Sequence, residues 1–206
     1  MSAVLPYTVA ARVASSPMLE LFTHPLLNAD HELVEAVAVL RWGPLTALFV
    51  LLSAWWIKGP VYIVAGVLRD LRRGDVPLTG LAVFAAVLLS SACSTVLKEL
   101  FDRDRPPLAD PDFEAAVGVP ASASFPSGHA STAFAAAAAL ALLVPSARWP
   151  ALLLASGVAL SRVYLGVHYA LDVVAGAALG VAVALLVVWG ARRVLGTRIA
   201  PTGMRA

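Results

Sequence analysis

Cysteine and charge are both scarce in this chain. Cys93 is the only cysteine among 206 residues, so the sequence allows no disulfide within the chain and no cysteine-based zinc site. Charged residues make up 14% of the chain, against about 25% in typical soluble domains. No run of basic residues with interleaved aromatic residues occurs, which argues against a nucleic acid partner. The chain also lacks a basic start followed by a compact apolar run, so we expect no cleaved signal peptide.

Apolar residues are abundant instead. They make up 60% of the chain, and the mean hydropathy is +0.82. This composition predicts an integral membrane protein, an all-α polytopic bundle of transmembrane helices in one domain over residues 1–206. A membrane-spanning helix needs roughly 20 mostly apolar residues. Four stretches reach this length, two of them only with flanking residues: Val76–Leu100, Gly128–Val144, Trp149–Tyr164 and Leu171–Ala191.

The region before the first of these stretches allows two interpretations. A span over Leu45–Leu68 would contain Lys58 and the Gly59-Pro60 pair, whereas a span over Leu33–Trp56 would contain Glu35 and Arg41. We favour the first span.

The N-terminal region, residues 1–43, is then interfacial. Residues Ala29–Arg41 are predicted to form an amphipathic helix on the membrane surface. The transmembrane bundle covers residues 45–191 and has five spans, or six if the weakly apolar segment Met18–Leu27 also inserts. Residues 192–206 form a tail.

Arginine residues predict the orientation, because cytoplasmic loops of membrane proteins are rich in basic residues. Alternating the helices brings Arg69, Arg72, Arg73 and Arg148 to the same side as the basic tail. That side, with the C-terminus, is expected to be cytoplasmic. The opposite, extracytoplasmic face then receives three polar motifs, although these motifs played no part in the assignment.

The first motif is a pair of cations near the end of an apolar segment. Lys98 and Arg105 lie seven residues apart, about two helical turns, so both can face one site if the helix persists. Arginine holds phosphate oxygens through its planar fork, and lysine acts as a point charge. The alternative is that these cations only reach towards the membrane surface, as we expect of the neighbouring Arg103.

The second motif is Pro126-Ser127-Gly128-His129, directly before the apolar run that begins at Ala130. Proline and serine suit the start of a helix, and glycine lets a ligand approach the backbone closely. The free amides of a first helical turn bind anions without any side-chain charge. A simple helix cap with an incidental histidine is the alternative.

The third motif runs from Ser161-Arg162 to His168 and Asp172. His168 and Asp172 are four residues apart, so the carboxylate can accept a hydrogen bond from one imidazole nitrogen and leave the other free to attack. Arg162 adds a third cation. The alternative is a histidine that only helps to bury Asp172, but ionisable groups at membrane depth are usually functional.

The two remaining histidines, His24 and His31, have no partner at a useful spacing and are predicted to be surface residues. No set of histidine, cysteine and carboxylate residues has the spacing of metal ligands, so we expect neither a metal nor another cofactor. Fixed lysine and arginine residues already neutralise a bound phosphate.

Together the three motifs resemble the type 2 phosphatidic acid phosphatase superfamily, membrane lipid-phosphate phosphatases whose site is shared with vanadium haloperoxidases and glucose-6-phosphatase. The motifs match without a gap, and they span about a third of the chain. One departure is Asp104, where relatives often have proline. The resemblance implies a metal-independent phosphatase acting through a phosphohistidine. His168 would be the nucleophile, Asp172 would orient it, and His129 would protonate the leaving oxygen. The phosphate would be bound by five residues: Lys98, Arg105, Ser127, Gly128 and Arg162.

The resemblance leaves the substrate open. Phosphatidate, phosphatidylglycerol phosphate and undecaprenyl diphosphate all fit a site in a bilayer, whose lipids are the other expected partner. A membrane transporter that moves anions or protons through the same buried charges is the main alternative. A vanadate-dependent haloperoxidase is disfavoured, because those relatives are soluble. The oligomeric state cannot be read from these residues.

Overall fold

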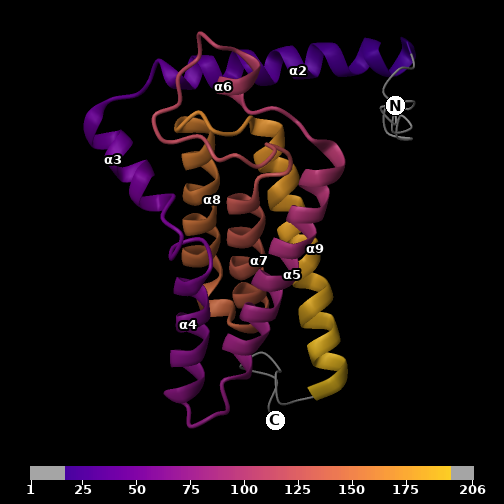
Figure 1. Cartoon of the computed structure of the whole chain (residues 1–206). Coiled ribbons are helices and arrows are strands. Elements are labelled where there is room, and N and C mark those ends of the chain that lie inside the picture. Colours follow the sequence, from indigo (N-terminus) through magenta and orange to yellow (C-terminus); the bar gives the residue numbers. More distant parts are fainter. Residues whose placement is uncertain (1–16, 196–206) are drawn as a thin grey trace, which may run out of the picture.

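The computed structural model describes the backbone of residues 17–195 and the side chains of residues 26–194, which leaves most of the predicted tail outside the described residues. This part of the chain is helical and contains no strand (Figure 1). The helices are α2 (Pro17–Ala38), α3 (Gly43–Leu52), α4 (Pro60–Leu71), α5 (Leu78–Phe101), α6 (Pro106–Ala109), α7 (Gly128–Leu143), η1 (Pro145–Ala147), α8 (Arg148–Tyr164) and α9 (Ala170–Leu195).

Helix α7 forms the centre of the bundle. The alanines of Ala135–Ala139 are all buried, and α5, α8 and α9 pack around them. Small side chains let helix backbones approach closely, and α9 uses two glycines for the same purpose. A Cβ atom on Gly176 would lie 2.5 Å from the carbonyl oxygen of Ser127, and one on Gly180 would lie 2.2 Å from that of Ser131. The contact between α7 and α9 is therefore a contact of backbones.

The predicted spans after residue 75 agree with the helices. Helices α5 and α9 are long and apolar enough to cross a membrane by themselves, and α3 and α7 are shorter apolar helices. Exposed leucine and tryptophan side chains cover the outer faces of the bundle.

The predicted span Leu45–Leu68 is not one continuous helix. The structure divides this segment into α3 and α4, with an irregular turn over residues 53–59 between them (Figure 1). Pro60 is the cause, because a proline has no amide proton for the helical ladder and fits the first turn of a new helix. Gly59 forms the N-cap of that helix.

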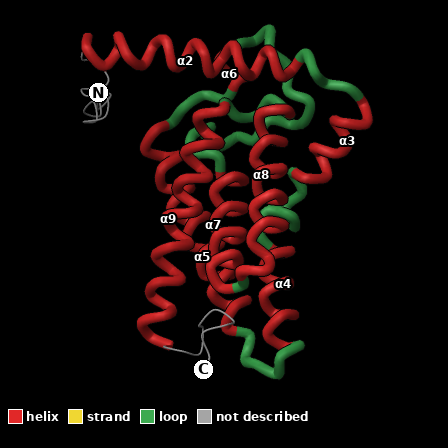
Figure 2. Tube along the Cα trace, turned by 180° about the vertical axis from the view of Figure 1, so that it is seen from behind, coloured by secondary structure: helices red, strands yellow, loops and turns green. Residues whose placement is uncertain are grey.

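Helix α2 lies across one end of the bundle rather than along it (Figures 1 and 2). It covers both N-terminal segments singled out above, Met18–Leu27 and most of Ala29–Arg41, as one helix. Val34 of this helix is fully buried and packs with Phe113 and Tyr169. The long connection that contains α6 lies at the same end of the bundle (Figure 1).

The two ends of the bundle differ in chemistry. The loop between α4 and α5, the start of α8 and the end of α9 lie together at the end opposite α2, and they carry the arginines that predicted the orientation (Figure 1). The end of α5, the start of α7 and the connection between α8 and α9 lie at the α2 end. The three polar motifs therefore meet at one end of the molecule.

Candidate active site

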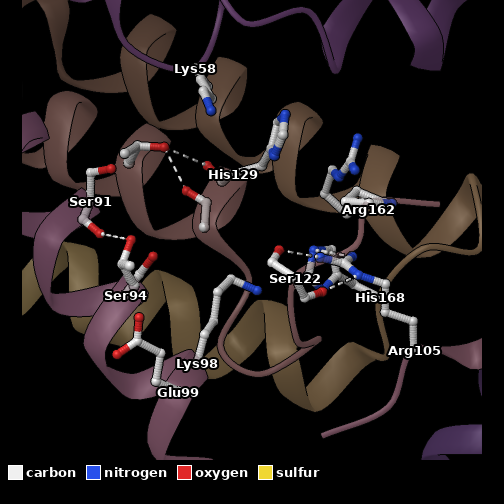
Figure 3. A pocket seen from close by; sticks show the side chains of 14 residues that line it. Lys58, Ser91, Ser94, Lys98, Glu99, Arg105, Ser122, His129, Arg162 and His168 are labelled. Atoms are coloured by element: carbon white, nitrogen blue, oxygen red, sulfur yellow. Dashed lines mark hydrogen bonds between the residues drawn. The ribbon is translucent and has the colours of Figure 1, made fainter. Parts of the chain in front are cut away.

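A cavity of about 340 Å³ lies where the three motifs meet (Figure 3). Six of the eight residues predicted to form the site line it: Lys98, Arg105, Gly128, His129, Arg162 and His168. Asp172 lies behind His168 and is fully buried. Ser127 does not line the cavity; it is fully buried and its hydroxyl has no hydrogen-bond partner among the described residues.

His168 lies in the short connection between α8 and α9. Gly166 makes the preceding turn possible, because its φ of +75° lies in the region that favours glycine. His168 is buried, and its Nε2 lies 3.1 Å from Nη1 of Arg105. Arginine can only donate, so Nε2 must accept and the ring proton is assigned to Nδ1. The lone pair of Nε2 is thus directed towards the cations of the cavity.

The Nδ1 side of His168 faces Asp172 and Ser124. Nδ1 lies 3.5 Å from Oδ2 of Asp172 and 3.3 Å from Oγ of Ser124. The Ser124 hydroxyl donates to the same carboxylate oxygen at 2.5 Å, so its lone pairs remain available to the imidazole N–H. Asp172 therefore orients the imidazole both directly and through Ser124, a residue that the sequence motifs did not indicate.

Arg103 is a second residue that the sequence interpretation missed. Rather than reaching towards the membrane surface, it donates to Oδ1 of Asp172 at 2.6 Å and to Oδ2 of Asp30 at 2.9 Å. Its guanidinium also lies over the ring of Tyr169, 4.0 Å from the centroid. The expectation that Arg103 is a surface charge is wrong, because both of its partners are buried carboxylates.

The three cations are held by backbone and hydroxyl oxygens, not by carboxylates. Arg105 donates to the carbonyl oxygens of Ser122 and Val167 at 2.8 and 2.6 Å. Lys98 donates to the carbonyl oxygen of Ala123, and Arg162 donates to the hydroxyl of Ser53. Because neutral acceptors leave the positive charges uncompensated, the cavity favours a polyanion.

Helix α7 directs its N-terminus at the same cavity. The first helical bond runs from the amide of Ser131 to the carbonyl oxygen of Ser127, so the amides of residues 128–130 have no partner within the helix. A Cβ atom on Gly128 would lie 3.3 Å from Oγ of Ser94, which shows how closely this turn approaches α5. His129, the second residue of the helix, lines the cavity, as Arg162 and His168 do (Figure 3).

Burial changes the acid–base behaviour of His168. Loss of solvent disfavours the imidazolium form and lowers the pKa of His168 to about 4, although the hydrogen bond to Asp172 opposes this effect. The imidazole is therefore neutral near pH 7, which is the form that can attack an electrophile.

One group outside the cavity has the composition of a metal site. His31 lies 3.3 Å from Glu35 and 3.6 Å from Asp110, and the three ligand atoms lie within 4.8 Å of one another. The prediction that His31 has no partner is wrong, because Glu35 is one helical turn away. These residues lie partly exposed between α2 and the long connection and do not line the cavity. The side chain of His24 lies outside the described residues.

Several curated proteins similar to this chain are phosphatases by name, and one is named as the bacitracin transport permease protein BcrC of Bacillus licheniformis. A match of 98 residues is 47% identical to the decaprenylphosphoryl-5-phosphoribose phosphatase of Mycolicibacterium smegmatis and covers 47% of this chain and 51% of that protein. A match of 105 residues is 37% identical to the lipid A 1-phosphatase of Rhizobium etli and covers 49% of this chain and 45% of that protein. The chain thus spans about half the length of these two phosphatases.

Solved structures are similar over more of the chain. The transmembrane PAP2 type phosphatidylglycerolphosphate phosphatase of Bacillus subtilis has a TM-score of 0.70 and 26% identity, with 90% of this chain and 92% of that chain covered. LpxE of Aquifex aeolicus shares the fold, with a TM-score of 0.64 and 22% identity over 77% of this chain and 93% of that chain. A family model described as the PAP2 superfamily matches residues 79–194, a range that contains all three motifs and more than half of the chain. The chain belongs to the PAP2 superfamily.

Proposed function

We propose that this protein is an integral membrane phosphatase that hydrolyses a phosphomonoester or a diphosphate of a lipid. One observation carries the proposal: a buried, neutral His168 directs the lone pair of Nε2 into a cavity that also contains Lys98, Arg105 and Arg162. A nucleophile beside several fixed cations is suited to attack on a phosphate.

The first step is attack by Nε2 of His168 on phosphorus. The N–P bond forms, the bond from phosphorus to the leaving oxygen breaks, and His129 gives that oxygen a proton. The N–H of Arg105 that donates to Nε2 in the free enzyme donates to a phosphate oxygen instead. Asp172 stabilises the positive charge that the phosphorylated imidazole acquires, because its carboxylate faces Nδ1.

Water completes the reaction. Neutral His129 accepts a proton from the water molecule, whose oxygen attacks phosphorus as the N–P bond breaks. Inorganic phosphate leaves, and His168 and His129 return to their starting protonation states. The free amides at the start of α7 help to bind the phosphate oxygens throughout.

The names of similar proteins support a lipid substrate. The Mycolicibacterium smegmatis relative is named for decaprenylphosphoryl-5-phosphoribose, and the Rhizobium etli relative for lipid A. The Bacillus subtilis phosphatase is named for phosphatidylglycerolphosphate. Phosphatidate, phosphatidylglycerol phosphate and undecaprenyl diphosphate therefore remain the candidate classes for this chain.

The topology that accompanies this function has five spans, counting α3 and α4 as one broken span. Helix α2 lies on the membrane surface, which its position across the end of the bundle supports (Figure 2). The active site faces the extracytoplasmic side and the C-terminus is cytoplasmic, because the arginine-rich loops lie at the other end.

The test is to trap the phosphoenzyme. Wild-type protein incubated with a ³²P-labelled lipid phosphate in detergent and quenched in alkali should carry acid-labile label, and His168→Ala should carry none. His129→Ala should still be labelled by p-nitrophenyl phosphate, whose leaving group needs no proton. Label that persists in His168→Ala and disappears in His129→Ala would reverse the two roles. Anion transport by proteoliposomes without any phosphate release would favour the transporter instead.

A further inference from the structure

The break between α3 and α4 brings Lys58 into the active-site cavity. Lys58 lies in the turn over residues 53–59 and lines the cavity with Lys98, Arg105 and Arg162 (Figure 3). None of the three motifs contains it. Irregular backbone at membrane depth is tolerated where it lines a cavity, and intramembrane ionisable residues are usually functional. The three motifs do not explain why the break in this span places a lysine in the cavity.

Lys58 has no counter-ion among the described residues, with which it forms neither an ion pair nor a hydrogen bond. The charged group with which it interacts most is Arg162, and it also acts on the ring of His129. Of the described residues that line the cavity, Glu99 alone carries a carboxylate, and it forms no ion pair with Lys58. A partly buried cation beside another cation is unfavourable unless an anion joins them.

The position of Lys58 identifies which part of a substrate it can reach. The attacking and leaving groups of a phosphoryl transfer lie roughly in line on opposite sides of phosphorus. His168 is the attacking group and His129 protonates the leaving oxygen, so the leaving group lies on the side of His129. Lys58 and His129 line the cavity next to each other, away from the ring of His168 (Figure 3), so Lys58 lies beside the leaving group rather than beside the phosphate under attack.

We infer that Lys58 binds a second phosphate, one that remains on the leaving group. This inference rests on the proposed function and narrows the substrate class. A lipid diphosphate, or a phosphate attached to a phosphodiester headgroup, has an anionic leaving group that Lys58 can bind. Phosphatidate has none, because its leaving group is an uncharged diacylglycerol. Ser91 and Ser94 line the same cavity and supply further hydroxyl donors.

The experiment compares two substrates that differ only in the leaving group: diacylglycerol diphosphate and phosphatidate with the same acyl chains, in the same detergent micelles. Lys58→Met should lower kcat/KM for the diphosphate about 10- to 100-fold, the effect of one hydrogen bond to a charged group. Its kcat/KM for phosphatidate should change less than about threefold, because no leaving-group phosphate contacts Lys58. Lys58→Arg should retain most of the activity on the diphosphate.

The matched control is Arg73→Met, which removes a cation from the exposed loop at the opposite end of the bundle and should alter neither substrate. As a second measurement, Lys58→Met should weaken inhibition by methylene diphosphonate and leave inhibition by orthophosphate unchanged. Equal losses on both substrates, or no loss on the diphosphate, would overturn the role of Lys58 while leaving the phosphatase proposal intact. Wild-type protein that releases phosphate from neither lipid would overturn the proposed function itself, and the role of Lys58 with it.

Discussion

Arg103 should control the rate of the reaction although it does not line the cavity. Asp172 is fully buried, and Arg103 is the donor to its Oδ1 atom. The other carboxylate oxygen is already occupied by the Ser124 hydroxyl and the amide of Tyr169. Arg103→Met therefore leaves one buried carboxylate oxygen without its donor and removes one of the three contacts that hold the carboxylate beside His168.

The expected magnitude follows from that contact. A hydrogen bond to a charged group contributes about 1.5–3 kcal/mol, and each 1.36 kcal/mol is tenfold in rate. The Arg103 side chain is 20% exposed, so the lower half of this range applies and kcat should fall about 10- to 50-fold. The KM for a lipid phosphate should change little, because Arg103 does not touch the substrate.

The pH profile separates this positioning role from simple loss of stability. Removing a nearby cation makes the imidazolium form of His168 easier to reach, so the acidic limb of the kcat/KM profile should move to higher pH. Asp30→Asn is the matched control, because it removes the distant partner of Arg103 and keeps the pair with Asp172. A folded Arg103→Met protein with unchanged kcat and an unchanged kcat/KM profile against pH would refute this positioning role of Arg103.

Three further outcomes are expected. On the acid side of the kcat/KM profile, activity should be lost as pH falls through the lowered pKa of His168, about 4, because the imidazolium form cannot attack phosphorus. An acidic limb at or above pH 6.5 would contradict the burial of His168. Gly180→Ala should lower the melting temperature, at a cost of about 1–3 kcal/mol for overpacking against α7, whereas Gly190→Ala, with no atom within 4 Å, should be neutral or stabilising. A saturating chelator should leave phosphate release unchanged and vanadate should inhibit it; loss of activity restored by a divalent ion would contradict a metal-independent reaction.

Most of the helices and the convergence of the motifs could be predicted from the sequence. Long apolar runs predicted α5 and α9, and alternation of the helices predicted that Lys98, His129 and His168 meet at one end. Both inferences rest on local properties, namely hydropathy and the spacing of residues along a helix. They needed no knowledge of which distant side chains touch.

The residues that the sequence interpretation missed depend on distant contacts. Arg103 is 73 residues from Asp30 and 69 residues from Asp172, so no pattern along the chain links it to either carboxylate. Ser124 lies in a polar connection with no helical periodicity. Two signals were present in the sequence. Lys58 beside Gly59-Pro60 was recognised inside the apolar run but not interpreted as a break or as part of the site, and the spacing of His31 and Glu35 by one helical turn was not used.

Close backbone packing explains how a bundle of small residues can fix the separation of the two histidines. His129 lies in the first turn of α7 and Asp172 in the first turn of α9, and the amide of Ser127 donates to the carbonyl oxygen of Asp172 at 2.9 Å. One turn further along α9, Gly176 brings that helix against the carbonyl oxygen of Ser127. The backbone of α7 thus sets the position of Asp172, and Asp172 orients His168. The exposed side chains of the bundle take no part in this chain of contacts, so the outer surface can vary while the separation of His129 and His168 stays fixed.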